Sequence, residues 1–313
     1  MSTVSRRKFL HHSFRTGILL AGASVWPAAH GIVPFRRRGG PRLLLSLAAY
    51  SFRNYFKDAD HERDAVVDPS RKIDLFQFLD YCAEQGCQGA ELTSYYFPKP
   101  LPEQFLIRLK RHAFLRGIEI SGTAVGNTFT DPKGDKRSQE IALVKRWIDH
   151  AQEMGAPHVR VFAGSAPRGM EKEQAKKLCI EALEDCCSYA AAKGIFLGLE
   201  NHGGIVAEAQ DLLEIVQAVD SPALGINLDT GNFNTSDPYA DLERCAPYAI
   251  NVQLKGELHP RGQPKTAADL TRLVRILREA NYQGYVALEY ESAEDPWKAV
   301  PPLLRRMKEL FQS

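Results

Sequence analysis

Short apolar runs and longer amphipathic stretches alternate along most of this 313-residue chain. The short runs are rich in Leu, Ile, Val and Ala, which is typical of strands buried on both faces. In the longer stretches, apolar residues recur every three or four positions, as on one face of a helix. The pattern predicts eight strands, at residues 43–51, 89–93, 119–125, 158–163, 195–201, 224–229, 249–255 and 285–291.

The amphipathic stretches predict helices between these strands, and glycines mark several of the turns that lead into the next strand. Strands that alternate with helices indicate an α/β fold with a parallel sheet. Eight such units in one chain of this length predict a single (β/α)8 TIM barrel over residues 43–313. The predicted helices include residues 73–84, 139–154, 172–192, 211–218 and 267–280, and the turn glycines are Gly86, Gly117, Gly155, Gly194 and Gly284.

The first 31 residues have the pattern of an export signal. Ser5-Arg-Arg-Lys-Phe-Leu10 is followed by a weakly apolar, small-residue run over residues 16–25, and then by Pro27-Ala-Ala29. This order resembles a twin-arginine signal peptide with a small-residue cleavage region. We therefore expect a signal peptide at residues 1–31 and a basic, glycine-containing linker at 32–42. The alternative is a chance Arg-Arg pair ahead of a helix that frays.

A twin-arginine signal implies a partner and a location. The twin-arginine export machinery carries folded proteins, so the chain is expected to fold in the cytoplasm and to act in the periplasm. No run reaches the roughly 18 apolar residues of a bilayer-spanning helix, so no stable membrane span is expected.

Composition narrows the class of protein further. Hydrophobic residues make up 44% and charged residues 25% of the chain, as in ordinary globular proteins. The net charge is +2, and because seven basic residues lie within the first 38 positions, the remainder is slightly acidic. A slightly acidic body argues against a nucleic-acid partner. The six cysteines form no Cys-x-x-Cys pair, so they are expected to pack as small apolar groups.

Polar residues collect where the last four predicted strands end. In a TIM barrel these carboxyl ends meet at one mouth, where active sites lie. Carboxylates that converge in a buried mouth need a cation or strong hydrogen-bond donors between them. Taken singly, each residue could equally be a solvated charge or a capped turn. The residues concerned are Glu200, Asn201, His202, Asp229, Asn232, Gln253, Lys255, Glu289 and Glu291.

At these positions the chain resembles the xylose isomerase-like barrel superfamily, which includes sugar phosphate isomerases and epimerases, hydroxypyruvate isomerase and metal-dependent apurinic endonucleases. The likeness extends over roughly residues 43–311. It rests on the segments LAAYSF, GAELTS, GLENHGG, GINLDTGNF, INVQLKGE and GYVALEYE.

The resemblance implies one divalent cation, bound by Glu200, Asp229, Gln253 and Glu289. Where many epimerases have histidine, this chain has Gln253, as in the hydroxypyruvate isomerase branch. An all-oxygen ligand set favours Mn²⁺ or Mg²⁺. The alternative is that Gln253 only hydrogen-bonds to neighbouring ligands.

The resemblance also implies a sugar or keto-sugar substrate and two catalytic carboxylates, Glu200 and Glu289. One removes the proton α to a metal-bound carbonyl, and the other returns a proton to the enediolate. If a leaving group lies β to the carbonyl, the same site makes a lyase or dehydratase. A non-catalytic, exported carbohydrate-binding barrel is the alternative of another class.

Other positions bear on the substrate. Ketohexose epimerases have a histidine where this chain has Asn232 and a second glutamate where it has Val206, so a simple 3-epimerase is not expected. Export favours unphosphorylated sugars or oxidised glycosides. The residues expected to bind substrate are His202, Asn232, Lys255, His259 and Arg261; the alternative for Arg261 is an exposed loop charge, and for Lys255 an ion pair with Glu257 or Glu291.

Overall fold

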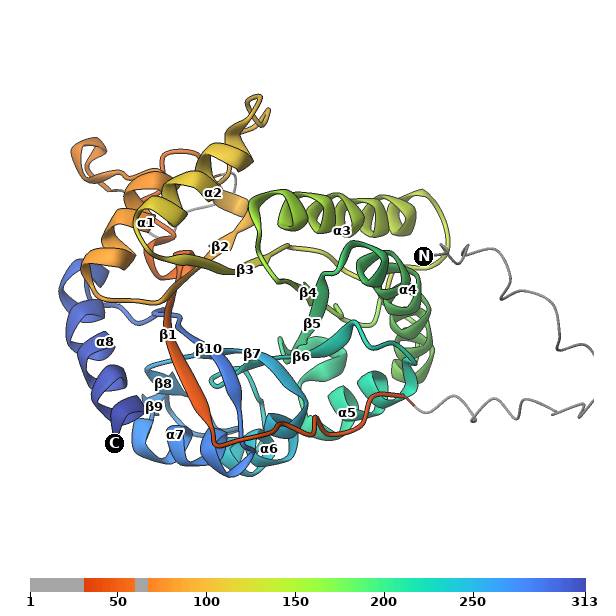
Figure 1. The fold of residues 1–313 in the computed structure, drawn as a ribbon. Helices are drawn as coiled ribbons and strands as arrows, with labels where there is room; N and C mark the ends of the chain where they lie inside the picture. Colours follow the sequence, from red (N-terminus) through yellow and green to blue (C-terminus); the bar gives the residue numbers. More distant parts are fainter. Residues whose placement is uncertain (1–30, 60–66) are drawn as a thin grey trace, which may run out of the picture.

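The computed structural model describes residues 31–59 and 67–313; the predicted signal peptide therefore lies almost entirely outside the described residues. Eight parallel strands close into a barrel in the order β1-β10-β7-β6-β5-β4-β3-β2. The barrel is ringed by helices (Figure 1). This confirms the predicted (β/α)8 TIM barrel. The barrel strands are β1 (Arg42–Ala48), β2 (Gly89–Thr93), β3 (Glu119–Ala124), β4 (His158–Phe162), β5 (Phe196–Glu200), β6 (Leu224–Asp229), β7 (Ala249–Leu254) and β10 (Gln283–Leu288).

The helices follow the strands in sequence and cover the outside of the barrel (Figure 1). Short polar caps fix where several of them begin: the Asp74 side chain accepts from the Gln77 amide at the start of α1, and Asp269 does the same for Arg272 at α7. Gly155 and Gly194, both with positive φ, end α3 and α4. The helices are α1 (Leu75–Glu84), α2 (Phe105–Leu115), α3 (Asp135–Met154), α4 (Lys172–Lys193), α5 (Ala209–Ala218), α6 (Pro238–Cys245), α7 (Leu270–Glu279) and α8 (Pro296–Gln312).

Two further features frame the two ends of the barrel. The loop after β7 carries a small antiparallel hairpin of β8 (Glu257–Leu258) and β9 (Thr266–Ala267). At the other end, residues 31–41 run along the barrel from α5 to β1 (Figure 1). Within this segment the Phe35 amide donates to Pro247 O at 3.0 Å. The segment predicted as a linker is thus packed against the barrel.

The strands divide the core into an apolar outer layer and a polar inner layer. Alternate side chains such as Leu197 and Leu199 on β5 are fully buried and belong to the apolar core. The other set faces the barrel axis, where many TIM barrels place branched apolar residues. Here the inward set is largely polar, and includes Ser46, Glu91, Ser121, Arg160, Asn227, Asn251 and Gln253. All six cysteines are buried and free, as expected. Among the described residues, no helix is long and apolar enough to cross a membrane.

Candidate active site

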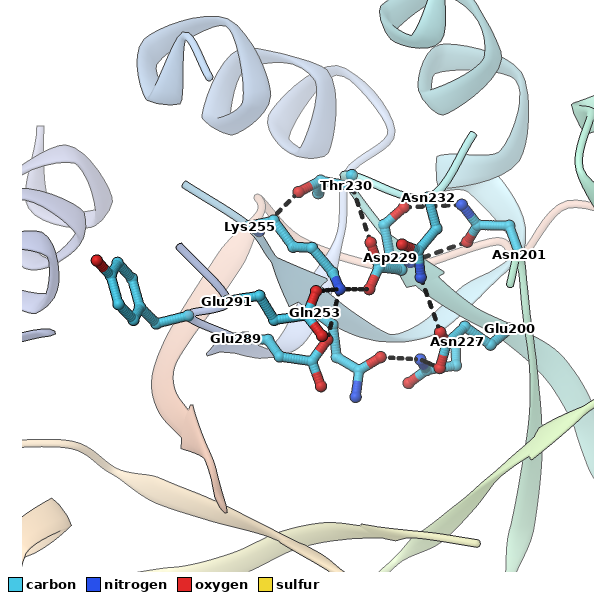
Figure 2. Close-up of polar contacts among 12 residues, drawn as sticks. Glu200, Asn201, Asn227, Asp229, Thr230, Asn232, Gln253, Lys255, Glu289 and Glu291 are labelled. Carbon is cyan, nitrogen blue, oxygen red and sulfur yellow. Dashed lines mark hydrogen bonds and ion pairs between the residues drawn. The ribbon is translucent and has the colours of Figure 1, made fainter. Parts of the chain in front are cut away.

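The four predicted metal ligands gather at the carboxyl ends of β5, β6, β7 and β10. Glu200 and Asp229 are the last residues of β5 and β6, Gln253 is the last but one of β7, and Glu289 directly follows β10. Their exposed fractions are 2%, 0%, 1% and 5%. Because these four strands are neighbours in the barrel, their polar ends point into one space (Figure 2).

Lys255 provides a positive charge between two of these carboxylates. Its Nζ lies 3.4 Å from Asp229 Oδ2 and 3.1 Å from Glu289 Oε2. It also pairs with Glu291 at the rim (Figure 2). Gly231 makes room for this side chain, since a Cβ there would lie 2.8 Å from Lys255 Cδ. Lys255 therefore supplies a positive charge of the protein's own within the site.

Arg160, on β4, provides the second positive charge. Its Nε lies 2.9 Å from Glu200 Oε2, and both side chains are almost fully buried. The guanidinium also donates to Val125 O at 3.0 Å and lies over the Phe162 ring. Asn232 Nδ2 donates to the other oxygen, Glu200 Oε1, at 3.0 Å. Asn227 Nδ2 also donates to Glu200 Oε2 at 3.3 Å. Glu200 is thus held in one orientation by an ion pair and two hydrogen bonds.

Below the carboxylates, a network of amides fills the barrel axis. Asn227 Nδ2 donates to Gln253 Oε1 at 2.6 Å, and Gln253 Nε2 donates to Glu91 Oε1 at 2.5 Å. Asn251 Nδ2 donates to Glu91 Oε2 at 2.7 Å. The amide oxygen of Gln253 is therefore fixed on the β6 side of the site, and its nitrogen on the Glu91 side.

Asp229 keeps one oxygen without a hydrogen bond. Its Oδ1 accepts from the Gly231 amide at 2.8 Å, and its backbone is bound on both sides by the Asn201 side chain. Its Oδ2 is buried and has no hydrogen-bond partner among the described residues; Lys255 Nζ is the nearby positive charge. A buried carboxylate oxygen without a hydrogen bond is suited to binding a cation.

Burial and the two cations set the pKa values of the carboxyl groups. Burial raises the pKa of Glu91 and of Glu200 to about 7. Burial also raises the pKa of Asp229. For Glu289, burial acts in the same direction, but Lys255 and Arg160 outweigh it and the pKa lies below its usual value. The two predicted catalytic glutamates thus differ in protonation tendency: Glu289 is ionised and Glu200 titrates near neutrality.

The interior of the barrel mouth contains more acidic than basic side chains. Four buried carboxyl groups, Glu91, Glu200, Asp229 and Glu289, face two buried cations, Arg160 and Lys255. If all were ionised, two negative charges would be uncompensated, which burial disfavours. Protons or one divalent cation can balance that excess.

The residue types suit a hard divalent cation, but their side-chain positions in this structure are not those of a metal site. Carboxylate and amide oxygens are the usual ligands of Mg²⁺ and Mn²⁺. The Lys255 ammonium shows where a cation is held between Asp229 and Glu289, while Glu200 is turned to Arg160. Among the described residues, no three His, Cys, Asp or Glu side chains form a group that could hold a metal ion. A cation bound by the predicted set would thus have to displace Lys255.

The cavity above these residues has a volume of about 150 Å³. Glu200, Lys255 and Glu289 form its floor, and His202 lines it next to Phe162, whose ring centroid is 4.2 Å away. Tyr50 and Tyr95 complete an aromatic wall. Aromatic faces of this kind suit the apolar face of a sugar ring.

The other predicted substrate-binding residues lie in different places. Asn232 contacts Glu200, as described, and Lys255 lies among the carboxylates. His259 lines a neighbouring cavity over the β7–α7 loop. Arg261 forms an ion pair with Glu208 and donates to Asn234 O. Its contacts therefore join two loops.

Arg160, Glu91 and Asn227 were missed by the sequence analysis. The signal for Arg160 was a charge at an alternate position of a predicted apolar strand, His158-Val-Arg-Val-Phe162. Glu91 stands in the same way in Gly89-Ala-Glu-Leu-Thr93. A charge in the middle of such a strand can only face the barrel axis, because the other face is covered by helices.

Comparison with known families shows to which family the chain belongs. Residues 79–309 match the family described as "Xylose isomerase-like TIM barrel". The chain belongs to this family. The predicted resemblance is thereby confirmed at the level of the family and fold.

Relatives of this chain have names that state different reactions. A protein of Mus musculus named "Putative hydroxypyruvate isomerase" is 24% identical over 245 residues, covering 69% of this chain and 84% of its own length. The "3-oxo-isoapionate decarboxylase" of Pectobacterium atrosepticum is 26% identical over 186 residues, covering 58% of this chain and 61% of its own length. An isomerase and a decarboxylase, by their names, are thus among the relatives of this chain.

Several solved structures share the fold of this chain. A "D-tagatose 3-epimerase-like protein" superposes with a TM-score of 0.65 at 18% identity, covering 86% of this chain and 98% of its own. The "IOLI protein with a binding zinc atom" has a TM-score of 0.66 at 18% identity, covering 85% and 96%. A "3-keto-D-glucoside 4-epimerase" from E. coli has a TM-score of 0.62 at 16% identity, covering 86% and 100%. Such identities show the fold alone.

Proposed function

We propose that this chain is a divalent-metal-dependent isomerase or epimerase of an unphosphorylated sugar or keto-sugar. The observation that carries the proposal is the excess of two buried negative charges at the barrel mouth, in a family whose named members include sugar isomerases and epimerases. One divalent cation would neutralise that excess, with Mn²⁺ or Mg²⁺ favoured by the all-oxygen donors.

The predicted ligands are Glu200, Asp229, Gln253 and Glu289. When bound there, the cation would polarise the substrate carbonyl as a Lewis acid. Asp229 Oδ2 has no hydrogen bond to give up for a cation. Glu200, Glu289 and Gln253 each have another partner in this structure and would have to exchange it.

The two glutamates are assigned as base and acid from their environments. Lys255 and Arg160 lower the pKa of Glu289, and a divalent cation that displaced Lys255 would favour the ionised form as well, so we assign Glu289 as the base that removes the proton α to the carbonyl. Burial keeps Glu200 near pKa 7, so it returns a proton. β5 and β10 are separated in the barrel by β6 and β7, so the two side chains approach a substrate from different directions. Asn232 and Arg160 hold Glu200 in place for this step.

Proton exchange in D₂O tests the reaction class and the two roles together. Keto-sugars are incubated with the Mn²⁺-loaded protein and followed by NMR. Glu289→Gln should lose deuterium incorporation and product together, by about 10²-fold or more. Glu200→Gln should incorporate deuterium into unreacted substrate yet form little product. Release of a β substituent would instead identify a lyase, and sugar binding without any exchange would identify a non-catalytic barrel.

Metal content tests the ligand set separately from activity. The purified protein should carry close to one equivalent of divalent metal after loading, and Asp229→Ala should carry far less. Asp241→Ala serves as a matched control, because Asp241 is a buried aspartate on α6, away from the strand ends. Equal metal content in Asp229→Ala and the wild type would contradict the assignment.

Export to the periplasm is part of the same proposal. It is supported by the sequence of residues 1–31 alone. Replacing both Arg6 and Arg7 by Lys should leave the precursor in the cytoplasm, as measured by fractionation. Lys8→Arg is the control, because it keeps the pair intact. Unchanged export of the double variant would contradict the signal assignment.

A further inference from the structure

A second cavity adjoins the one that contains the glutamates. It has a volume of about 300 Å³, twice that of the inner cavity. Both cavities are lined by Lys255 and Glu291, so this ion pair is the boundary between them. Glu291 is about one-third exposed, which places the boundary near the mouth. A ligand that extends past this pair enters the outer cavity directly.

The inner cavity alone is small for the substrate of an enzyme. Small-molecule sites usually measure roughly 300 to 1,000 Å³, and the inner cavity reaches only about 150 Å³. It has room for the reacting ring and little else. With the outer cavity included, the site enters the usual range. The combined shape therefore suits a molecule with two units, one on each side of the Lys255–Glu291 pair.

The outer cavity is held open by contacts between its loops. Arg261, in the β7–α7 loop, pairs with Glu208 and donates to Asn234 O, while its own amide donates to Thr235 O at 2.8 Å. The β8–β9 hairpin braces the same loop. The wall of the cavity is thus fixed before any ligand arrives, as in most small-molecule sites.

The lining of the outer cavity indicates the chemistry of the second unit. Asn232, Asn234 and His259 supply hydrogen-bonding groups, while Phe233 and Leu258, only 1% and 3% exposed, close the back of the cavity. Amide and imidazole groups of this kind suit a hydroxyl-bearing ring.

The charges of the lining argue against a phosphate as the second unit. Lys255 and Lys265 are present, but Glu257 and Glu291 balance their charge, and among the described residues no arginine lines this cavity. Phosphate sites are typically built on arginine, lysine clusters or helix N-termini. The same argument applies to a carboxylate.

We infer that the outer cavity is a subsite for a second, uncharged sugar unit, so that the substrate is a keto-glycoside or keto-disaccharide. This inference rests on the proposed function for the identity of the reacting ring. The oxidised ring lies in the inner cavity beside Glu200 and Glu289. The attached unit lies between Asn234 and His259, against the β7–α7 loop.

The test compares a keto-monosaccharide with disaccharides that carry the same oxidised ring. The probes are 3-keto-glucose and the 3-keto derivatives of cellobiose and maltose, which differ only in the linkage. Turnover is measured as kcat/KM, and affinity is measured calorimetrically on Glu289→Gln. We expect one of the disaccharides to exceed the monosaccharide at least tenfold in both quantities.

Asn234→Trp tests whether this preference comes from the outer cavity. Asn234 is exposed and lies in the lining, away from the glutamates, so a bulky ring there should occupy the second unit's place. In this variant, kcat/KM for the disaccharide should be about equal to that for the monosaccharide. The monosaccharide's own kcat/KM should stay within about twofold of the wild-type value. Gln263→Trp is the control, because Gln263 is exposed on the neighbouring β7–α7 loop but is not part of the lining. Thermal melts of both variants verify folding. Lys265→Leu repeats the test with a smaller change in the same lining.

The outcomes separate this inference from the proposed function. Exchange and binding that are equal for the monosaccharide and both disaccharides would overturn the subsite and leave the isomerase standing. A tenfold preference in affinity without exchange of any sugar would retain the subsite and refute the isomerase. An unchanged preference in Asn234→Trp would also overturn the subsite.

Discussion

Lys255→Met gives the sharpest test of how the site is held together. The substitution keeps the length and apolar stem of the side chain but removes the ammonium. That ammonium lies 3.4 Å from Asp229 Oδ2 and 3.1 Å from Glu289 Oε2, and its side chain is only 11% exposed. In the metal-free protein, Met would leave Asp229 without a nearby counter-charge and Glu289 with Arg160 alone.

The magnitude follows from the burial of these charges. Two unit charges about 3 to 3.5 Å apart attract by roughly 5 kcal/mol at an effective dielectric constant of about 20. Removing one partner of a buried pair typically costs about 3 to 5 kcal/mol, because the remaining charge stays desolvated. Protonation of a carboxylate would relieve part of this cost. We therefore expect Lys255→Met to lower the free energy of unfolding by about 3 kcal/mol in EDTA at pH 8.

The assay is urea unfolding, with Lys145→Met as the control. Lys145 forms a pair with Asp185 at 2.7 Å, but its side chain is 30% exposed and that of Asp185 is 51% exposed. Such surface pairs contribute about 0 to 1 kcal/mol. If Lys255→Met costs no more than Lys145→Met, the ammonium does not stabilise the mouth as argued.

Added Mn²⁺ should then act more strongly on the variant than on the wild type. Without Lys255 the cation meets no competitor between Asp229 and Glu289, so its affinity should rise by about tenfold or more. The two charges that the cation carries would also restore the lost stability by linkage. Weaker Mn²⁺ binding in Lys255→Met would show that lysine and metal do not share one position, and would contradict the predicted ligand set.

Three other predictions follow from individual side chains of the site and core. Arg160→Met should lower kcat by about tenfold or more with a smaller change in KM, because it frees Glu200 to reorient; an unchanged kcat would refute its positioning role. Gln253→His should shift the metal preference towards Zn²⁺ by about tenfold, because imidazole suits zinc, whereas Gln174→His on the exposed face of α4 should not. Burial lowers the pKa of His158 to about 4 in the folded protein, whereas in the unfolded chain it is about 6.5. Above pH 6.5 both states are neutral and the fold has its full stability. Between pH 6.5 and 4 the unfolded chain binds a proton that the folded protein does not, and about 3 kcal/mol of stability is lost. Between pH 7 and pH 4 the free energy of unfolding of His158→Leu should therefore fall by about 3 kcal/mol less than that of the wild type, as measured by urea unfolding. Equal decreases in the two proteins would refute the argument.

The sequence predicted the barrel because apolar periodicity alone determines where its strands lie. All eight predicted strands overlap the observed ones, and the errors are at the ends. The first was predicted to continue to residue 51, but β1 ends at Ala48 because Ala49–Phe52 forms a 3-10 turn. The last was predicted at 285–291, whereas β10 is Gln283–Leu288. Glu289 and Glu291 therefore lie just beyond the strand, at the mouth.

The contacts inside the mouth were harder to predict, because they depend on which neighbour each long side chain reaches. Strand ends and spacing placed Glu200, Asp229, Gln253 and Glu289 together. They did not reveal that Lys255 reaches back between Asp229 and Glu289 while also pairing with Glu291. The ion pair with Glu291 was one of the alternatives considered for this residue. Arg160 comes from a strand on which no carboxylate lies, so only the closed barrel shows that it meets Glu200.

This arrangement explains how a mouth so rich in carboxylates can fold before any cation is bound. Arg160 neutralises Glu200 and Lys255 neutralises Glu289, and the raised pKa values of Glu91 and Asp229 allow protons to neutralise the other two. The mouth is thus stable without a divalent cation, at a cost in metal affinity, because a cation must displace both the protons and the ammonium. Glu291 lessens that cost: it already binds Lys255 at the rim, where its side chain is one-third exposed, so the ammonium can move outward without losing its partner. Displaced to this position, Lys255 would stay at the boundary of the two cavities, where it can contact both units of a substrate.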